Sequence, residues 1–161
     1  MKIVAALVLI ALVAFVVARR LFGSRQSGSW VDPNDSELAA AEAQAKASLP
    51  DFLRRLEQPG PGETDFMLKF RLRSGGEAEQ IWAEEITKRD GRIYGRLGNR
   101  PISAGYSEGQ EVEIPPGDIL DWGYRAGEVM QGHFSTRALM PRMPRETAAH
   151  IRRQFGWDRA T

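Results

Sequence analysis

The sequence has no cysteine and, among its 161 residues, only two histidines, His133 and His150. Without cysteine the chain can form no disulfide framework, no thiolate metal site and no cysteine nucleophile. Two histidines leave little material for a histidine-rich metal centre. The sequence therefore gives no reason to expect a bound metal.

Several motifs of enzymes and of nucleic-acid-binding proteins are also missing. There is no glycine-serine-glycine nucleophile elbow and no serine–lysine pair in a suitable setting. Gly-x-Gly-x-x-Gly and Walker-type phosphate loops are absent as well. Lys and Arg total 22 against 21 acidic residues, so the net charge gives no footprint for nucleic acid. We expect a protein without a cofactor and without a nucleic-acid partner.

One long hydrophobic run stands at the start of the chain. Residues 3–18 are all apolar, and Leu21 and Phe22 extend the run across Arg19 and Arg20, whose long side chains can reach lipid headgroups. Counted in this way, the segment approaches the ~20 residues that cross a bilayer as a helix. A cleaved signal peptide is the alternative. We expect retention, because two arginines would directly follow the cut.

The charges that flank this run predict its orientation. Arg19, Arg20 and Arg25 outweigh Lys2, which places the following chain on the cytoplasmic side. We therefore expect a single-pass protein of the inner (cytoplasmic) membrane, with residues 1–22 as a transmembrane anchor that contacts lipid through residues 3–22. Residues 23–33 are rich in glycine and serine and are typical of a flexible linker.

A helix is predicted next. Asn34, Asp35 and Ser36 are candidate caps, and the apolar residues between positions 38 and 56 form one stripe. That stripe is more typical of a face that packs on the domain's own sheet than of a coiled coil. Pro50 interrupts the pattern and predicts a kink or a restart.

From Phe66 the apolar period changes to two, which predicts strands. Strands are expected at residues 66–72, 79–86, 92–97, 112–114, 119–124 and 129–134. The predicted fold is α+β: the N-terminal helix packs on a strongly bent antiparallel β-sheet or a small, partly open barrel, preceded by one transmembrane helix. This domain covers residues 34–140. Residues 141–161 are expected to form a short C-terminal amphipathic helix, which either lies on anionic lipid or docks on the domain.

Several short motifs follow one another between Ala41 and Leu139. They include Ser48-Leu49-Pro50-Asp51-Phe52-Leu53, Glu79-Gln80-Ile81-Trp82, Gly95-Arg96-Leu97-Gly98-Asn99-Arg100-Pro101, Ile119-Leu120-Asp121-Trp122-Gly123-Tyr124 and Gly132-His133-Phe134-Ser135-Thr136-Arg137. In this order they resemble the bacterial family known as domain of unknown function 2314. The resemblance implies a shared fold and supplies no reaction. Gln80 stands where that family would have histidine, and Gly98 where alanine is commoner.

Two carboxylates lie beside aromatic residues: Glu79 near Trp82, and Asp121 directly before Trp122. Such a pair could act as acid and base if burial separated the two pKa values. In the structural alternative, Asp121 bonds backbone amides of a turn and Glu79 faces water. His133 could be a general base, although a lone histidine on a strand is usually packed or exposed.

The loop that contains Asn99 is a further candidate. Asparagine before Arg100-Pro101 suits a left-handed bend, and it could instead read a ligand between Trp82 and Trp122. We expect a non-catalytic module that binds a protein or envelope component at the membrane surface. The alternatives are a small-ligand-binding protein or hydrolase that uses Glu79, Asn99 and Asp121, and an immunity-type protein that neutralises a toxin.

Overall fold

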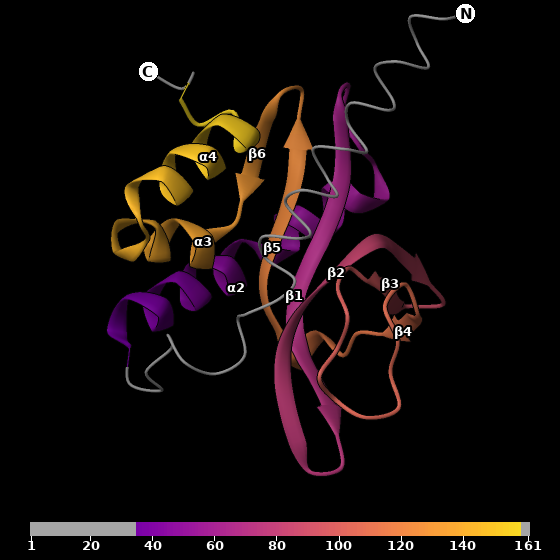
Figure 1. The fold of residues 1–161 in the computed structure, drawn as a ribbon. Coiled ribbons are helices and arrows are strands. Elements are labelled where there is room, and N and C mark those ends of the chain that lie inside the picture. Colours follow the sequence, from indigo (N-terminus) through magenta and orange to yellow (C-terminus); the bar gives the residue numbers. More distant parts are fainter. Residues whose placement is uncertain (1–34, 159–161) are drawn as a thin grey trace, which may run out of the picture. The chain divides into compact units, whose positions relative to one another are not determined.

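A computed structural model describes residues 35–158 as an α+β domain, as predicted (Figure 1). The strands are β1 (Glu63–Ser74), β2 (Glu77–Arg89), β3 (Arg92–Leu97), β4 (Glu111–Glu113), β5 (Ile119–Ala126) and β6 (Val129–Gly132). The helices are α2 (Ser36–Glu57), α3 (Phe134–Leu139) and α4 (Arg145–Phe155), with short 3-10 turns η1 (Pro116–Asp118) and η2 (Met140–Arg142).

The predicted transmembrane helix at residues 1–22 and the linker at residues 23–33 lie outside the described residues. Within residues 35–158, no helix is both long enough and apolar enough to cross a bilayer.

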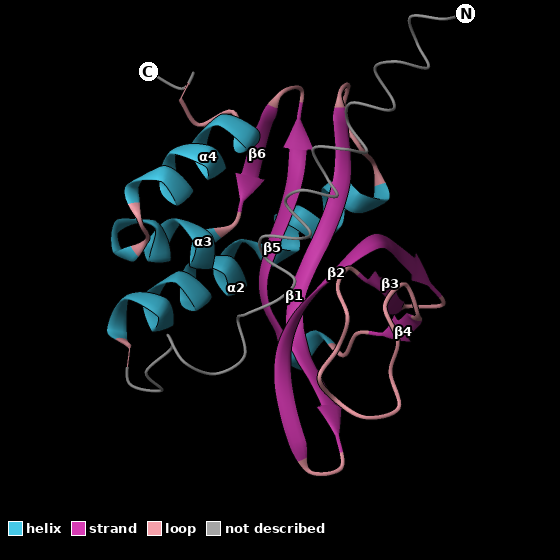
Figure 2. Cartoon of the chain, in the orientation of Figure 1, coloured by secondary structure: helices cyan, strands magenta, loops and turns pink. Residues whose placement is uncertain are grey.

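The six strands form one open antiparallel sheet in the order β4-β3-β2-β1-β5-β6 (Figure 2). β1 lies at the centre, between β2 and β5. The pairing register shifts near Asp65 and near Glu85, two non-glycine residues with φ of 53° and 50°. Such bulges bend a sheet. The bend was predicted, but the barrel alternative is wrong, because β4 and β6 are free edges and do not pair with each other.

Helix α2 is anchored at its start and along one face. The Asp35 side chain accepts hydrogen bonds from the backbone N–H of Glu37 and Leu38, so this residue is the predicted cap. The helix does not restart at Pro50 and runs through to Glu57. Its buried residues lie on both sides of the proline: Ala41, Ala45 and Phe52. Packing against the sheet therefore holds the two halves as one helix despite the missing N–H.

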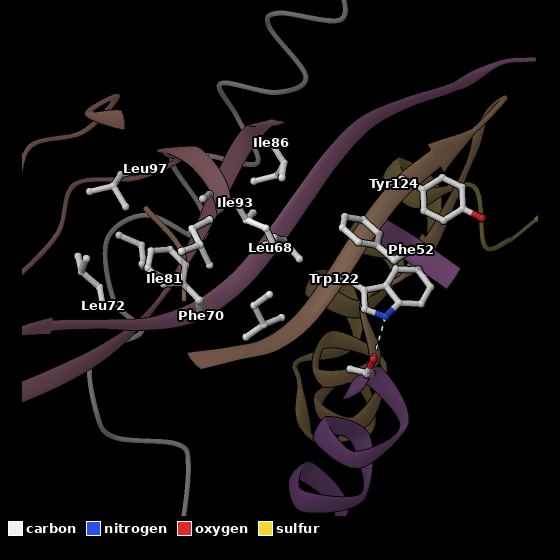
Figure 3. Close-up of a cluster of buried hydrophobic side chains, with 14 residues drawn as sticks. Phe52, Leu68, Phe70, Leu72, Ile81, Ile86, Ile93, Leu97, Trp122 and Tyr124 are labelled. Carbon is white, nitrogen blue, oxygen red and sulfur yellow. Dashed lines mark hydrogen bonds between the residues drawn. The ribbon is translucent and has the colours of Figure 1, made fainter. Parts of the chain in front are cut away.

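The main core lies between α2 and one face of the sheet, which we call the core face. Leu68 and Phe70 of β1 and Trp122 and Tyr124 of β5 point into it, as the period of two predicts. Phe52 of α2 is fully buried in the same cluster, 5.4 Å from the Trp122 ring (Figure 3). The dashed line in Figure 3 marks the bond from the Trp122 indole N–H to the carbonyl of Ala45, 3.0 Å long.

The predicted strand at residues 129–134 is too long. β6 ends at Gly132, His133 has φ of 53°, and α3 begins at Phe134. Gly132 has φ of 72°, and a Cβ there would lie 2.2 Å from the backbone oxygen of Trp122. Only glycine therefore fits where the chain leaves the sheet and enters α3.

Helix α4 forms where a C-terminal helix was predicted, and it docks on the domain. Ala148 and Ile151 are buried, and the left-handed Gly156 ends the helix. Just beyond it, the Trp157 indole N–H donates to the backbone oxygen of Met130 on β6, at 2.7 Å. The C-terminal segment is thereby fastened to the edge of the sheet.

Candidate functional site

The two candidate carboxylates lie on opposite faces of the sheet. Glu79 pairs across the strands with Leu72, on the core face. Asp121 pairs with Lys69, on the other face, which we call the reverse face. Successive side chains of a strand point to opposite sides, so the sheet itself separates the two acids. They cannot act as acid and base on one substrate.

The other predicted residues divide in the same way. Trp82 also pairs with Lys69 and belongs to the reverse face, whereas Trp122 pairs with Leu68 on the core face. Asn99 follows β3 and is half-buried. The five predicted residues therefore do not surround one cleft, and the two indoles do not form the two walls of a ligand site.

Asp121 is fully buried, and donors surround its carboxylate. Oδ1 accepts from the backbone N–H groups of Trp122 and Phe134, at 2.8 and 3.1 Å. Oδ2 accepts from the N–H and the hydroxyl of Ser135, at 2.8 and 2.6 Å. Burial raises the pKa of Asp121, and the same four hydrogen bonds oppose that rise. This carboxylate caps the first turn of α3 from a neighbouring strand, where His133 supplies no side-chain cap.

His133 packs against two aromatic rings on the reverse face. Its ring is 4.5 Å from Trp82 and 4.8 Å from Phe155 of α4, between ring centroids. Neither ring nitrogen has a hydrogen-bond partner in the part of the chain that the structure describes. A Cβ on Gly123 would lie 2.4 Å from the imidazole, so this glycine makes room for it. Burial lowers the pKa of His133 to about 3, helped by the nearby Arg137, and the ring is neutral at pH 7.

A third ionisable side chain on the reverse face, besides Asp121 and His133, is Lys69. Burial lowers the pKa of its ammonium, while the charges of Asp121 and Glu42 oppose that change. The reverse face thus holds an acid and two bases. However, four donors occupy the acid, and the imidazole is buried against two aromatic rings. The arrangement fastens α3 and α4 to the sheet and leaves neither Asp121 nor His133 open to a substrate.

Glu79 has a different partner: residues 98–110, which join β3 to β4 and which we call the 98–110 loop. Its Oε2 accepts from the backbone N–H groups of Ile102 and Ser103, at 2.9 and 3.2 Å. Its Oε1 is buried without a hydrogen-bond partner among residues 35–158. Glu79 was expected to face water in the structural alternative; instead it clamps this loop.

Two more bonds fix the 98–110 loop to the end of β1. The Ser74 hydroxyl donates to the backbone oxygen of Ala104 at 3.0 Å, and the Tyr106 hydroxyl donates to that of Arg73 at 3.3 Å. The Tyr106 side chain also packs against the main core. The side chains of Glu79, Ser74 and Tyr106 therefore hold the loop in place although it has no regular secondary structure.

Ile102 projects from this clamped loop. Its side chain is 69% exposed, and it is the only large hydrophobic residue so exposed within residues 35–158. Asn99 and the exposed Arg100 lie beside it in the sequence. A rigid loop that offers an apolar side chain next to polar groups is a typical contact site for another protein.

Sequence reasoning missed Lys69, Ser135 and Ile102. The signal for Ile102 was present: an apolar residue inside the glycine- and proline-containing stretch Gly98-Asn99-Arg100-Pro101-Ile102-Ser103-Ala104-Gly105 has no strand or helix in which to be buried. The role of Ser135 depends on α3, a helix that the sequence pattern did not reveal.

Among the described residues, no group of three or more histidine, aspartate or glutamate side chains is placed to hold a metal ion. No residues could therefore be assigned to a metal. The surfaces that remain as candidates for contact with another molecule are the 98–110 loop and the solvent-facing side of α4.

A family model described as "Uncharacterized protein conserved in bacteria (DUF2314)" matches residues 35–159. The chain belongs to the DUF2314 family. The resemblance found in the sequence motifs is thereby confirmed. A relative is the "Uncharacterized protein YegJ" of Escherichia coli (strain K12), 31% identical over 88 residues, which are 54% of this chain and 58% of the relative. The match thus spans less than two thirds of that protein. No solved structure matches the chain.

The buried carboxylate of this DUF2314 protein can be tested by replacing Asp121 with asparagine. The amide offers one acceptor oxygen, so two donors among Trp122, Phe134 and Ser135 lose their partner. We expect the free energy of unfolding to fall by roughly 2–4 kcal/mol, measured by urea denaturation. Asp51→Asn is the matched control, because Asp51 is 72% exposed and should change stability by less than about 1 kcal/mol. Equal small losses in both variants would contradict the capping role.

The buried imidazole predicts a particular pH dependence. The folded pKa of His133, about 3, lies below its ordinary value of about 6.5. Between these values the unfolded chain binds the proton, so stability falls as the pH falls through this window. Asparagine tolerates the left-handed backbone at this position. Replacing His133 with asparagine removes the pH-dependent contribution of the imidazole to stability, and it also removes the packing of the ring.

We therefore expect His133→Asn to be less stable than the wild type at pH 7.5, and the difference to shrink by roughly 3 kcal/mol at pH 4. Unfolding free energies of both proteins over this pH range provide the measurement. Asp121, Lys69 and Arg137 are present in both, so their own titration largely cancels. A difference that stays constant with pH would show that His133 binds its proton normally.

Proposed function

We propose that this DUF2314 protein is a non-catalytic binding module, tethered to the bacterial inner membrane, that presents the 98–110 loop to a protein or envelope partner. The observation that carries the proposal is Ile102, an apolar side chain held out in solvent on a loop that Glu79 fixes through two backbone amides. Fixing the loop before binding lowers the entropy cost of forming a complex.

The placement of the acids argues against the enzymatic alternative. A hydrolase built on Glu79, Asn99 and Asp121 needs these groups around one substrate. Glu79 and Asp121 are on opposite faces of the sheet, and each already accepts hydrogen bonds from backbone amides. A single acid without a partner at reaction distance provides no acid–base pair.

The membrane part of the proposal rests on the sequence. Residues 3–22 are nearly all apolar, and Arg19 and Arg20 fall near the end of that run, as in a single-pass anchor with the domain on the cytoplasmic side. A tether of this kind raises the effective concentration of the domain for a partner at the same membrane. An immunity-type protein that neutralises a toxin would use the same loop, and the experiment below identifies the partner.

The loop is tested with the full chain in its own membranes. A photo-reactive amino acid in place of Ile102 should cross-link to a partner, whereas the same group at the exposed Glu146 on α4 should not. The variant Ile102→Ser should recover at least about 30-fold less partner, as expected for an interface residue worth 2 kcal/mol. Because Ile102 is exposed, its replacement should change stability by no more than about 0.5 kcal/mol.

Glu146→Ser is the control for recovery: it replaces an exposed residue on α4, away from the loop, and should leave recovery unchanged. Cross-links of equal yield from both positions, or full recovery with Ile102→Ser, would contradict the proposed role of the loop.

A further inference from the structure

The solvent-facing side of α4 is basic, and its apolar side is packed against the domain. Ala148 and Ile151 are buried against the domain, so α4 has no apolar face left to insert into lipid. Arg145, Arg152 and Arg153 are exposed. At 100° per residue, Arg145 and Arg152 project within roughly 20° of each other, and Arg153 lies roughly 80° from Arg145. The three guanidinium groups therefore share one flank of the helix.

These arginines differ from others in the domain. Arg54, Arg89 and Arg92 each form an ion pair with an acidic side chain. Within the described part of the chain, no acidic side chain pairs with Arg145, Arg152 or Arg153, the basic flank of α4. Their charge is not neutralised by the domain, and it is complementary to an anionic surface.

The basic flank also lies on the part of the domain that the proposed tether enters. Arg142, just before α4, forms ion pairs with Asp35 and Glu37 at the start of α2. Residue 35 is where the described chain begins, directly after the residues proposed to form the anchor and linker. If the domain is tethered through residue 35, the part of it that carries α4 is therefore within reach of the bilayer.

We infer that the basic flank of α4 rests on anionic lipid headgroups, so that the domain docks on the cytoplasmic leaflet through electrostatic contact without insertion. The inference rests on the proposed tether and adds a defined orientation to it. α4 is fastened to β6, one edge of the sheet, whereas the 98–110 loop joins β3 to β4 and holds Ile102 at Glu79 of β2, beyond the central strand β1 (Figure 1). Docking through α4 thus turns Ile102 away from the lipid and toward a partner.

The absence of cysteine makes a direct test possible. The full chain carrying Ala149→Cys, which lies between Arg145 and Arg153 around the helix, is labelled with a fluorophore and reconstituted into phosphatidylcholine vesicles with or without phosphatidylglycerol. Lipids with a headgroup nitroxide quench a nearby label. We expect quenching to rise at least about fivefold with the anionic lipid, the factor that one arginine near such a surface provides, and to be lost at high salt.

Two variants give the matched comparison. The triple variant Arg145→Gln, Arg152→Gln and Arg153→Gln should lose the quenching. The triple variant Arg54→Gln, Arg89→Gln and Arg92→Gln removes the same charge from paired positions and should retain it. A label at Glu77→Cys, on the β1–β2 hairpin, should stay unquenched throughout.

The outcomes separate the inference from the tether. A chain that floats with both kinds of vesicle, yet shows no lipid-dependent quenching at Ala149→Cys, overturns the docking and leaves the anchor in place. Equal loss of quenching in both triple variants also overturns it. A chain that floats with neither vesicle overturns the tether, and the docking with it.

Discussion

The carboxylate of Asp121 joins the sheet to everything that follows it in the chain. It lies on β5, next to the central strand, and accepts four hydrogen bonds from Trp122, Phe134 and Ser135. A buried acid is costly unless its lone pairs are satisfied, so the first turn of α3 must stay in place. α3 in turn sets the path to η2 and α4, which covers His133 through Phe155. The acid that most resembles a catalytic group is therefore a structural one.

Much of the fold could be predicted because local patterns and tertiary packing agree. The period of two placed Leu68 and Phe70 in the core, and it set Trp122 and Tyr124 on one face. α3 could not be found in this way, since a six-residue helix has little pattern of its own and its cap comes from Asp121, a residue distant in the sequence. Pro50 does not start a new helix, because packing on both sides of it outweighs one lost hydrogen bond.

The candidate site was harder to predict because it depends on which face each side chain occupies. Alternation alone already separates Asp121 from Trp122, and Glu79 from Trp82, since these residues are one and three positions apart in a strand. Placing Glu79 relative to Asp121 needs the register through β1, which the sequence does not provide. The remaining surfaces lie on different sides of the central strand β1: the loop with Ile102 is clamped by Glu79 of β2, and the basic flank of α4 is beside β6 (Figure 1). A rigid domain between them could connect a membrane to a partner.

Amide hydrogen exchange in the native protein tests this account most directly, because it reports whether α3 opens independently of the sheet. If Asp121 fastens the two together, the N–H groups of Phe134 and Ser135 exchange as slowly as those of the central strand β1, such as Phe70, and only through global unfolding. Exchange of Phe134 and Ser135 many times faster than that of Phe70 would show that α3 opens by itself, and would contradict the claim that one buried carboxylate fastens α3 to the sheet.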